Sequence, residues 1–164
     1  MTPEIRPAKA ADAAAIAAIW NKIIVETTVT FTTIEKTPEA VAEDIAARQV
    51  AGQGYLVASD GAQLLGLACY GPFRGGPGYR FAMEHTIYLS EAAKGQGLGR
   101  RLITALEEHA RAAGHSCLIG AVSGENTAAQ AFHSRMGYVE VGRLPRVGHK
   151  FGRFLDMVLM QKLL

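Results

Sequence analysis

Apolar residues recur along the chain with two different periods, which predict helices and strands in alternation. An amphipathic helix is predicted to begin near Asp12, with its apolar residues at helical spacing: Ile16, Ile19, Trp20, Ile23 and Ile24. A second helix is predicted from Thr37, a capping hydroxyl followed by proline, to about Ala51. Two more are predicted before Gly114 and over 127–136, where glycine follows the last apolar residue.

Short apolar runs between turn residues predict the strands. They lie near Ile5, at 55–58, at 64–68, in the run that ends at Leu89, at 117–122, near 138–141 and at 154–161. The dipeptide Asp60-Gly61 predicts a hairpin between the second and third of them. Residues 72–78 form a glycine-rich loop. The predicted order is β-α-α-β-β-β-α-β-α-β-β, without repeats or linkers, which indicates one α/β (α+β) domain over residues 1–164.

A glycine-rich turn at 94–101 follows the strand that ends at Leu89 and leads into a helix. Glycines at 95, 97 and 99 let successive backbone N–H groups converge on an anion, and the helix start adds unpaired donors with a partial positive charge. Lys94, Arg100 and Arg101 supply positive charge beside it. The turn therefore predicts a phosphate site, although a plain strand-to-helix turn has the same short pattern.

The spacing of the glycines reduces the number of ligand classes that the turn can bind. A dinucleotide fingerprint reads G-x-G-x-x-G early in a βαβ unit with an acid about 20 residues on, whereas this chain has G-x-G-x-G in its middle and no such acid. The P-loop pattern, with its Gly-Lys-Ser/Thr ending, is absent. The spacing thus disfavours a nucleotide-dependent oxidoreductase or a P-loop enzyme.

Composition is that of an ordinary globular domain. The 164 residues are 49% hydrophobic and 20% charged, and the net charge of +2 with dispersed basic residues gives no case for nucleic-acid binding. No apolar run is long enough to cross a membrane, and the N-terminus lacks the apolar core of a signal peptide. Cys69 and Cys117 stand in apolar runs, which predicts buried free thiols in a cytoplasmic protein. The scattered histidines show no metal-ligand spacing, so no metal is expected.

The glycine turn resembles the acyl-CoA pyrophosphate loop of the GNAT N-acetyltransferases, in which Gln or Arg is followed at fixed spacing by Gly and by Gly or Ala. The signature maps onto Lys94, Gly97 and Gly99, with lysine departing from the usual first residue. The predicted order of elements is also that of the family. Asn126 and the turn at 135–138 match later family motifs. The resemblance implies the GNAT fold, a mixed, mostly antiparallel sheet of about seven strands flanked by about four helices.

Three further stretches resemble one subgroup, the phosphinothricin and methionine sulfoximine N-acetyltransferases. They lie at 27–31, 84–89 and 148–156. Phosphinothricin enzymes usually carry histidines in the last stretch, where this chain has Phe151 and Leu155. The version here is similar to the branch that acetylates methionine sulfoximine and methionine sulfone, with Phe154 in place of tryptophan. The resemblance implies an acceptor that is an amino acid or analogue with a free α-amino group, and a homodimer.

The chemistry of N-acetylation needs a base. An alkylammonium of pKa near 10 lies about three units from neutrality at pH 7, so freeing its lone pair costs roughly 4 kcal/mol. Glu84 matches the family's catalytic glutamate, although the residues alone favour a solvated acid at the end of a strand. The same stretch places His85 and Thr86 beside the substrate, where His85 either orients the substrate or packs its ring.

The resemblance implies that acetyl-CoA is the co-substrate. The residues assigned to it are Ile87, Tyr88, Leu89, Lys94, Gly95, Gln96, Gly97, Leu98, Gly99, Arg100 and Asn126. In the family, the strand before the loop separates from its neighbour, so N–H groups near 87–89 point at the thioester carbonyl. Tyr138 is a candidate general acid by analogy, but packing is at least as good an account, and the acid stays unassigned.

The acceptor's carboxylate requires a partner, and an arginine fork suits it. Arg74 and Arg80 lie in or beside the glycine-rich loop, and family correspondence puts Arg74 near the acceptor; surface arginines on a loop are the alternative. Phe31 is assigned to the same mouth, together with Lys150 and Arg153.

Two other functions stay open. A non-catalytic acyl-CoA sensor would keep the fold but is expected to lack the strand carboxylate. An acetyltransferase for protein amines would need an open acceptor groove.

Overall fold

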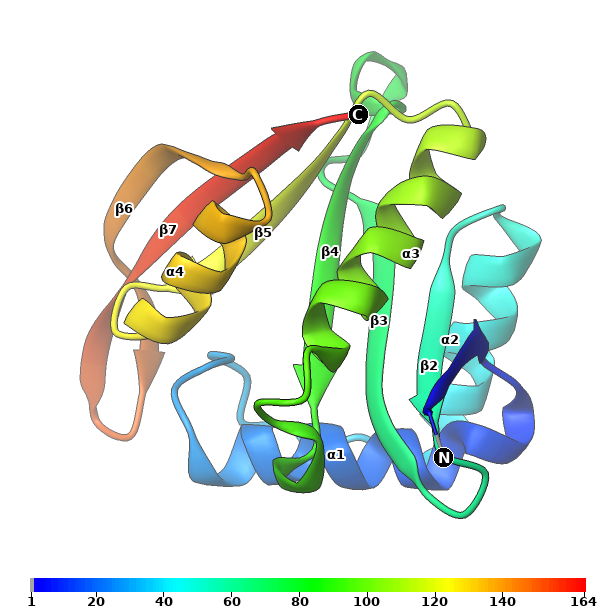
Figure 1. Cartoon of the computed structure of the whole chain (residues 1–164). Helices are drawn as coiled ribbons and strands as arrows, with labels where there is room; N and C mark the ends of the chain where they lie inside the picture. The colour runs from blue at the N-terminus through cyan, green and yellow to red at the C-terminus, as the bar shows by residue number, and fades with distance from the viewer. Residues whose placement is uncertain (1) are drawn as a thin grey trace.

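A computed structural model describes residues 2–164. One mixed sheet runs through this part of the chain in the order β1-β2-β3-β4-β5-β7-β6. Its strands are β1 (Glu4–Pro7), β2 (Tyr55–Ser59), β3 (Leu64–Pro72), β4 (Ala82–Leu89), β5 (Cys117–Ser123), β6 (Val139–Lys150) and β7 (Arg153–Leu163). The helices are α1 (Ala13–Glu26), α2 (Pro38–Val50), α3 (Leu98–Ala112) and α4 (Thr127–Arg135). Figure 1 shows the sheet as two halves that diverge beside α3.

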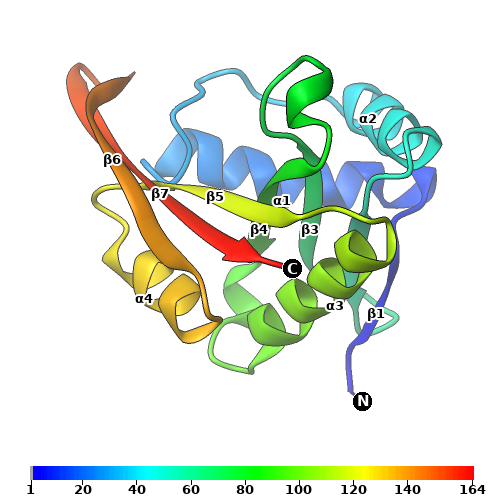
Figure 2. The same cartoon turned by 90° about the horizontal axis from the view of Figure 1, so that it is seen from above.

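The helices cover both faces of the sheet. Figure 2 shows α1 and α2 on one side of the strands, with α3 and α4 on the other. Each face has its own core, because side chains alternate between the faces of a strand. Ile16, Trp20 and Ile24 of α1 are buried against one face, and Leu102 and Leu106 of α3 against the other.

The predicted helix boundaries are largely confirmed. Thr37 caps α2, since its hydroxyl accepts a hydrogen bond from the Ala40 N–H at 3.1 Å. Gly114 and Gly137 follow α3 and α4 with φ of +84° and +89°, which is the left-handed conformation that glycine favours after a helix. The exception is the start of α3, which begins at Leu98 inside the glycine-rich turn because Gly97 is its N-cap.

The sheet has one parallel pair, β4 with β5, and that pair is short. Pairing joins only 82–85 to 117–120, whereas β4 continues to Leu89 and β5 to Ser123. The strands therefore separate after His85, while β4 stays paired to β3 along its whole length. This is the separation that the family resemblance implied, and it leaves backbone groups of both strands facing a gap.

The C-terminal strands are longer than the sequence pattern predicts. Residues 148–153, which the pattern leaves between the two predicted strands, hold the end of β6, a tight turn and the start of β7, and Phe151 has φ of +52° in that turn. The apolar alternation near Val139 and Val141 is interrupted by glycine, arginine and proline, which hides the rest of β6. The strand continues through two register shifts, the second between Leu144 and Gly148.

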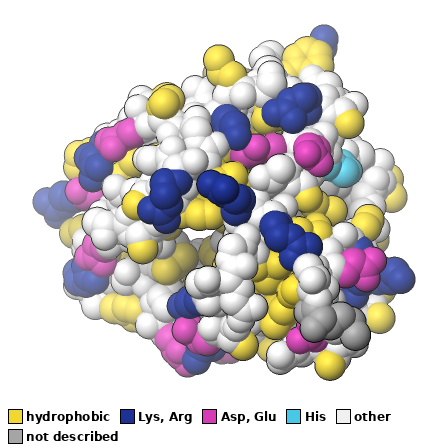
Figure 3. Space-filling view, in the orientation of Figure 1, with side chains coloured by type: hydrophobic (Ala, Val, Ile, Leu, Met, Phe, Trp, Pro, Cys, Tyr) yellow, Lys and Arg dark blue, Asp and Glu magenta, His cyan; other side chains and the backbone are white. Residues whose placement is uncertain are grey.

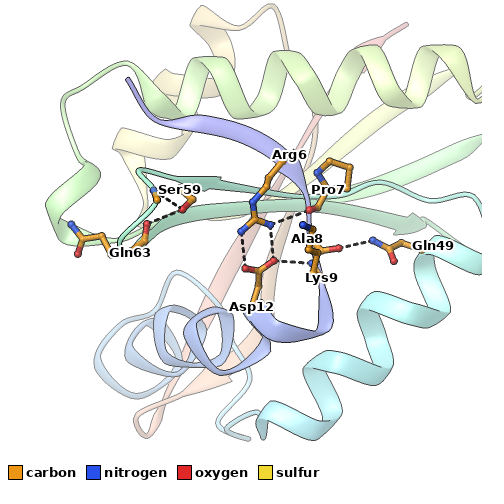
Figure 4. Close-up of polar contacts among 9 residues, drawn as sticks. Arg6, Pro7, Ala8, Lys9, Asp12, Gln49, Ser59 and Gln63 are labelled. Carbon is orange, nitrogen blue, oxygen red and sulfur yellow. Dashed lines mark hydrogen bonds and ion pairs between the residues drawn. The ribbon is translucent and has the colours of Figure 1, made fainter. Parts of the chain in front are cut away.

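Side-chain hydrogen bonds fix the N-terminal segment to α2 (Figure 4). Arg6 and Asp12 form a two-pronged ion pair at 2.8 and 2.9 Å, which lowers the pKa of Asp12. The side chain of Gln49 donates to the Ala8 carbonyl at 2.8 Å. The last turn of α2, which carries Arg48, is thereby held against the start of the chain.

Cys69 and Cys117 are buried and free, as expected. No helix among residues 2–164 combines the length and apolar character of a membrane span. Over the same residues, no group of three or more His, Cys, Asp or Glu side chains is placed to hold a metal ion.

Candidate active site

The gap between β4 and β5 opens into a cavity of about 710 Å³. Its walls are Glu84–Leu89 of β4, Gly120–Ser123 of β5, the segment 29–32 and one face of α4 that carries Ala129, Phe132 and His133. Lys94, Gly95 and Gly99 close one end, beside the start of α3. Figure 3 shows a hollow on this face with hydrophobic side chains in its wall and Lys and Arg side chains at its rim.

The glycine-rich turn has the backbone of an anion site. Gly95 and Gly97 have φ of +77° and +71°, a region that other residues rarely occupy. The N–H groups of Gly97, Leu98, Gly99 and Arg100 find no backbone acceptor in the part of the chain that the structure describes. They stand at the positive end of α3, a fifteen-residue helix. The turn therefore presents several donors and a partial positive charge to a phosphate.

The side chains of this turn contribute unequally. Lys94 pairs with Glu91 at 2.7 Å, and both are exposed. Gln96 donates to the Ala92 carbonyl at 2.7 Å, and Leu98 is buried in the core. Gln96, Gly97, Leu98 and Arg100 do not line the cavity. These four residues can therefore offer an anion their backbone N–H groups, with the Arg100 side chain as an exposed charge nearby.

Glu84 lies where two cavities meet. It lines the gap cavity and a second cavity of about 380 Å³ on the α2 face of the sheet. Burial raises the pKa of its carboxyl group above the ordinary value. The side chain is half-buried and makes no hydrogen bond with the described residues. A carboxylate in this state is available to take a proton from a group held in either cavity. Thr86 follows on the same face and also lines both.

His85 points to the opposite face and forms a pair with His133 of α4. Their Nε2 atoms are 2.9 Å apart, and the His133 Nδ1 is 2.8 Å from the Ala129 carbonyl. The carbonyl requires a proton on His133 Nδ1, so His85 Nε2–H donates to His133 Nε2. His85 Nδ1 then carries a lone pair, and it is buried without a partner among the described residues. Burial lowers the pKa of His85 to about 3, so the ring is neutral.

Two residues next to the histidine pair, Gly120 and Tyr138, have structural roles there. A Cβ at Gly120 would lie 3.1 Å from His85 and 3.3 Å from His133, so the glycine makes room for both rings. A glycine inside a predicted strand was the sequence signal that could have indicated that side chains pack closely against the backbone here. The Tyr138 ring packs 5.2 Å from each histidine ring and does not line the cavity. Burial raises the pKa of its hydroxyl, which favours packing over proton donation.

The segment before α2 forms the outer wall and is fixed by a buried lysine. The Lys150 ammonium donates to the Thr27 and Thr30 carbonyls at 2.6 and 2.8 Å, and the residue is 1% exposed. Phe31 lines the cavity, and a Cβ at Gly148 would collide with its ring. Phe31 thus lies at the mouth of the cavity, as predicted. Lys150 does not line the cavity and instead holds the 27–30 segment in place. Arg153 is also turned away, paired with Glu125.

Arg74 and Arg80 do not reach either cavity. Both are exposed, and their guanidinium groups stack on Tyr79 and Phe81 at 5.1 and 4.6 Å from the ring centres. Asn126, in contrast, lines the gap cavity as the N-cap of α4. Its Oδ1 accepts from the Ala129 N–H at 3.1 Å, which leaves the amide nitrogen available to a ligand.

Residues 19–138 match the model of the acetyltransferase (GNAT) family. The chain belongs to that family. This GNAT chain is 41% identical over 169 residues to the L-methionine sulfoximine/L-methionine sulfone acetyltransferase of Pseudomonas aeruginosa, covering 98% of this chain and 94% of the relative. It is 33% identical to the phosphinothricin N-acetyltransferase of Streptomyces viridochromogenes, covering 97% and 86%.

Solved structures confirm the fold of this GNAT chain. An acetyltransferase of Salmonella typhimurium, solved with its cofactor acetyl-CoA, superposes with a TM-score of 0.96 at 32% identity, covering 99% of this chain and 94% of that one. A chain of Brucella melitensis named ribosomal-protein-alanine N-acetyltransferase gives a TM-score of 0.95 at 37% identity, covering 98% and 99%. The expected GNAT fold and the expected acetyltransferase family are both confirmed.

Proposed function

We propose that this N-acetyltransferase moves the acetyl group of acetyl-CoA onto the α-amino group of a small amino acid or analogue, of the methionine sulfoximine, methionine sulfone or phosphinothricin type. The observation that carries the proposal is the half-buried carboxylate of Glu84 at the junction of the gap cavity and a polar cavity. The names of the relatives supply the acceptor class. The buried free thiols fit a reducing compartment such as the cytoplasm.

The shape of the site suits acetyl-CoA. The turn at 94–100 offers unpaired N–H groups to the pyrophosphate, at the end of the cavity that Gly95 and Gly99 close. The unpaired edges of β4 and β5 offer backbone hydrogen bonds to the amide-containing arm between them, with Asn126 at its side. Alternate N–H groups of Thr86–Leu89 face the same gap. The stretch Ile87–Leu89 thereby holds the thioester and polarises its carbonyl through those of its N–H groups that face the gap, an effect worth about 3–4 kcal/mol per well-aimed donor.

Glu84 acts as the general base. Its carboxylate takes a proton from the incoming ammonium, directly or through water, and the freed lone pair attacks the polarised carbonyl carbon. The C–S bond then breaks as the nitrogen of the adduct gives up its second proton and the sulfur gains one, so that coenzyme A leaves as the thiol; the group that carries this proton stays unassigned. Base catalysis of this kind contributes about 10²- to 10⁴-fold. The raised pKa of Glu84 matches its basicity better to the task than that of an exposed carboxylate.

Two alternatives make different demands on the site. A protein amine as acceptor is favoured by the likeness to the Brucella melitensis chain. A small acceptor is favoured by the wall at 29–32, which Lys150 holds over the cavity. A non-catalytic sensor has no use for a half-buried acid between the two cavities.

The expected test result is fast thiol release from acetyl-CoA with methionine sulfoximine and methionine sulfone. Phosphinothricin, the common amino acids, polyamines and a peptide beginning with alanine complete the panel. Turnover restricted to amino-acid analogues supports the proposal, whereas turnover of the peptide alone supports the protein-amine function. Acetyl-CoA binding measured by calorimetry, with no turnover of any amine, would point to the sensor.

We also propose that the protein is a homodimer, formed through β6 and β7. The edge strand β6 exposes Val139, Val141 and Val147, and the neighbouring β7 exposes Phe154. An apolar edge strand is open to pairing with another chain. A second copy of this chain would cover both the side chains and the free backbone groups.

For the double variant Val141→Glu, Val147→Glu, light scattering is expected to give the mass of one chain, and for the unmodified protein the mass of two. Charges at both positions would be desolvated in the interface. The matched control is Val50→Glu on α2, an exposed valine far from β6, which is expected to stay dimeric. A dimeric double variant, or a monomeric unmodified protein, contradicts the proposed interface.

A further inference from the structure

Lys150, the last residue of β6, carries a buried ammonium group that has no carboxylate partner. The residue is 1% exposed and forms no ion pair with any residue from 2 to 164. A charge in such a place costs free energy unless hydrogen bonds replace those it made to water. The replacement comes from the carbonyls of Thr27 and Thr30, at 2.6 and 2.8 Å. Lys150 is thus committed to the backbone of one distant segment.

Both carbonyls belong to the start of the segment that follows α1. Thr27 is the C-cap of that helix, where carbonyls lack helical partners and the helix dipole favours a cation. Thr30 lies three residues further on and itself lines the gap cavity. Figure 1 shows this segment between α1 and the β6–β7 hairpin. One ammonium group therefore ties the end of α1 to the first residues of the cavity wall.

The same strand also determines where the Phe31 ring lies. The ring occupies the space in which Gly148, two residues before Lys150, would carry a Cβ. Gly148 pairs with Leu155 in the β6–β7 ladder and is not among the glycines with positive φ, so only the close approach of the ring requires a glycine here. The end of β6 thus holds the backbone of the wall through Lys150 and receives its aromatic ring at Gly148.

A third contact to the wall is exposed and ionic. The Thr28 hydroxyl donates to Glu125 Oε2 at 3.1 Å, and Glu125 pairs with Arg153 at the start of β7. The side chains of Glu125 and Arg153 are 44% and 51% exposed, and ion pairs of this kind contribute little to stability. Lys150 is therefore the main polar anchor of the wall.

The wall faces the cavity in which the proposed reaction takes place. Phe31 and Glu84 line the same cavity, so an acceptor whose amine lies at Glu84 has limited room for its side chain. We propose that Lys150 is a positioning residue that limits the size of the acceptor, because it holds Phe31 at the gap cavity. This inference rests on the proposed function. Lys150 does not line the cavity, so it acts through the wall and not on the acceptor.

The test compares methionine sulfoximine with its S-butyl homologue, which keeps the amine, carboxylate and sulfoximine groups and adds three methylene groups. The unmodified enzyme is expected to prefer the shorter acceptor in kcat/KM by at least about 10-fold, the smallest usual effect of a methylene that a pocket does not accommodate. Lys150→Met has a similar shape but leaves both carbonyls unpaired. It is expected to lose this preference through a lower KM for the longer acceptor.

The kcat with methionine sulfoximine and the Kd for acetyl-CoA should stay unchanged in Lys150→Met, because Glu84 and the turn at 94–100 are untouched. Gly148→Ala displaces the Phe31 ring while leaving the charge of Lys150 in place, and it should reduce the preference in the same way. In a Phe31→Ala background, Lys150→Met should have no further effect on the preference. Two residues that act through one contact give non-additive effects.

Lys162→Met is the matched control. Lys162 of β7 is also a partly buried lysine that donates to a backbone carbonyl, that of Met136 at 2.8 Å, and it lines neither cavity. It should lower the melting temperature, as Lys150→Met does, but keep the preference for the shorter acceptor. Loss of the preference in Lys162→Met would mean that general loosening of the fold, and not the wall, is responsible.

An unchanged preference in Lys150→Met, or in Gly148→Ala if the lysine variant does not fold, overturns the inference. Equal use of both acceptors by the unmodified enzyme, or additive effects of Lys150→Met and Phe31→Ala, also overturns it.

Calorimetry with the two acceptors distinguishes this failure from failure of the proposed function. Binding that favours the shorter acceptor only while Lys150 is present, without turnover of either, keeps the role of Lys150 and rejects the proposed chemistry. Turnover with a preference that no variant changes keeps the chemistry and rejects the role of Lys150. Binding of neither acceptor rejects both.

Discussion

Replacing Glu84 with glutamine is expected to lower kcat by about 10²- to 10⁴-fold at pH 7, the usual contribution of a positioned general base. The amide has nearly the same shape but cannot accept the ammonium proton. Thiol release under saturating acetyl-CoA and amine measures kcat, and titration calorimetry measures the Kd for acetyl-CoA. That Kd is expected to be unchanged, because the anion turn begins ten residues further along the chain.

Glu108→Gln is the matched control, because Glu108 is an exposed glutamate on α3 and lines neither cavity. It is expected to keep full activity. Undiminished kcat in Glu84→Gln removes Glu84 from the chemistry. A weakened acetyl-CoA complex would instead show that the residue supports the cofactor site.

The pH dependence follows from the direction of the Glu84 pKa. Burial raises this pKa, and the carboxyl group acts as a base only when it is deprotonated. Activity should therefore increase as the pH rises through a pKa above the ordinary glutamate value and then level off. In Glu84→Gln this acidic limb should be absent. The residual rate should instead increase up to the pKa of the amine, since only molecules that arrive unprotonated can react.

Local sequence signals account for most of the fold. Helix caps such as Thr37 and terminal glycines such as Gly114 act through the backbone of a few neighbouring residues, so their effect can be predicted from the sequence. The hairpin at Asp60-Gly61 is of the same kind. The glycine-rich turn at 94–101 could be predicted as an anion site because its conformation, and the start of the helix that follows it, depend only on neighbouring residues.

Side chains brought together from distant segments could not be predicted in this way. His133 stands in a helix pattern that says nothing of its partner His85, 48 residues away. Lys150 looks like a surface charge at a hairpin turn, yet it is buried by carbonyls some 120 residues earlier. Arg48 forms an ordinary helical ion pair with Asp44, and nothing in that pattern reveals that it lines the same cavity as Glu84 of β4.

The family resemblance assigned to the acceptor two long side chains on an exposed segment, and these lie outside both cavities. Arg74 and Arg80 have the right chemistry for a carboxylate, but their loop leaves the sheet and each guanidinium stacks on a neighbouring aromatic ring. The residues that were assigned to acetyl-CoA through their backbone do lie at the gap cavity. Ile87–Leu89, Gly95 and Gly99 all line the gap cavity, because strand separation and helix position are properties of the fold.

Replacing Gly97 with valine is expected to raise the Kd for acetyl-CoA by at least about 100-fold. Gly97 has φ of +71° as the N-cap of α3, a conformation that costs an ordinary L-residue about 1–2 kcal/mol and a β-branched one more. The valine therefore rotates the turn and carries the N–H groups of 97–100 away from the anion. Titration calorimetry with acetyl-CoA measures the effect directly.

Gly114→Val separates this effect from general strain. Gly114 follows the other end of α3 with φ of +84°, and at both glycines a Cβ meets no atom within 4 Å. The two variants should lose similar stability in thermal unfolding, because each forces valine into the same unfavourable region. Only Gly97→Val should lose acetyl-CoA affinity. Equal affinity in both variants would mean that the pyrophosphate does not depend on this turn, and the anion site would have to be sought elsewhere along the gap.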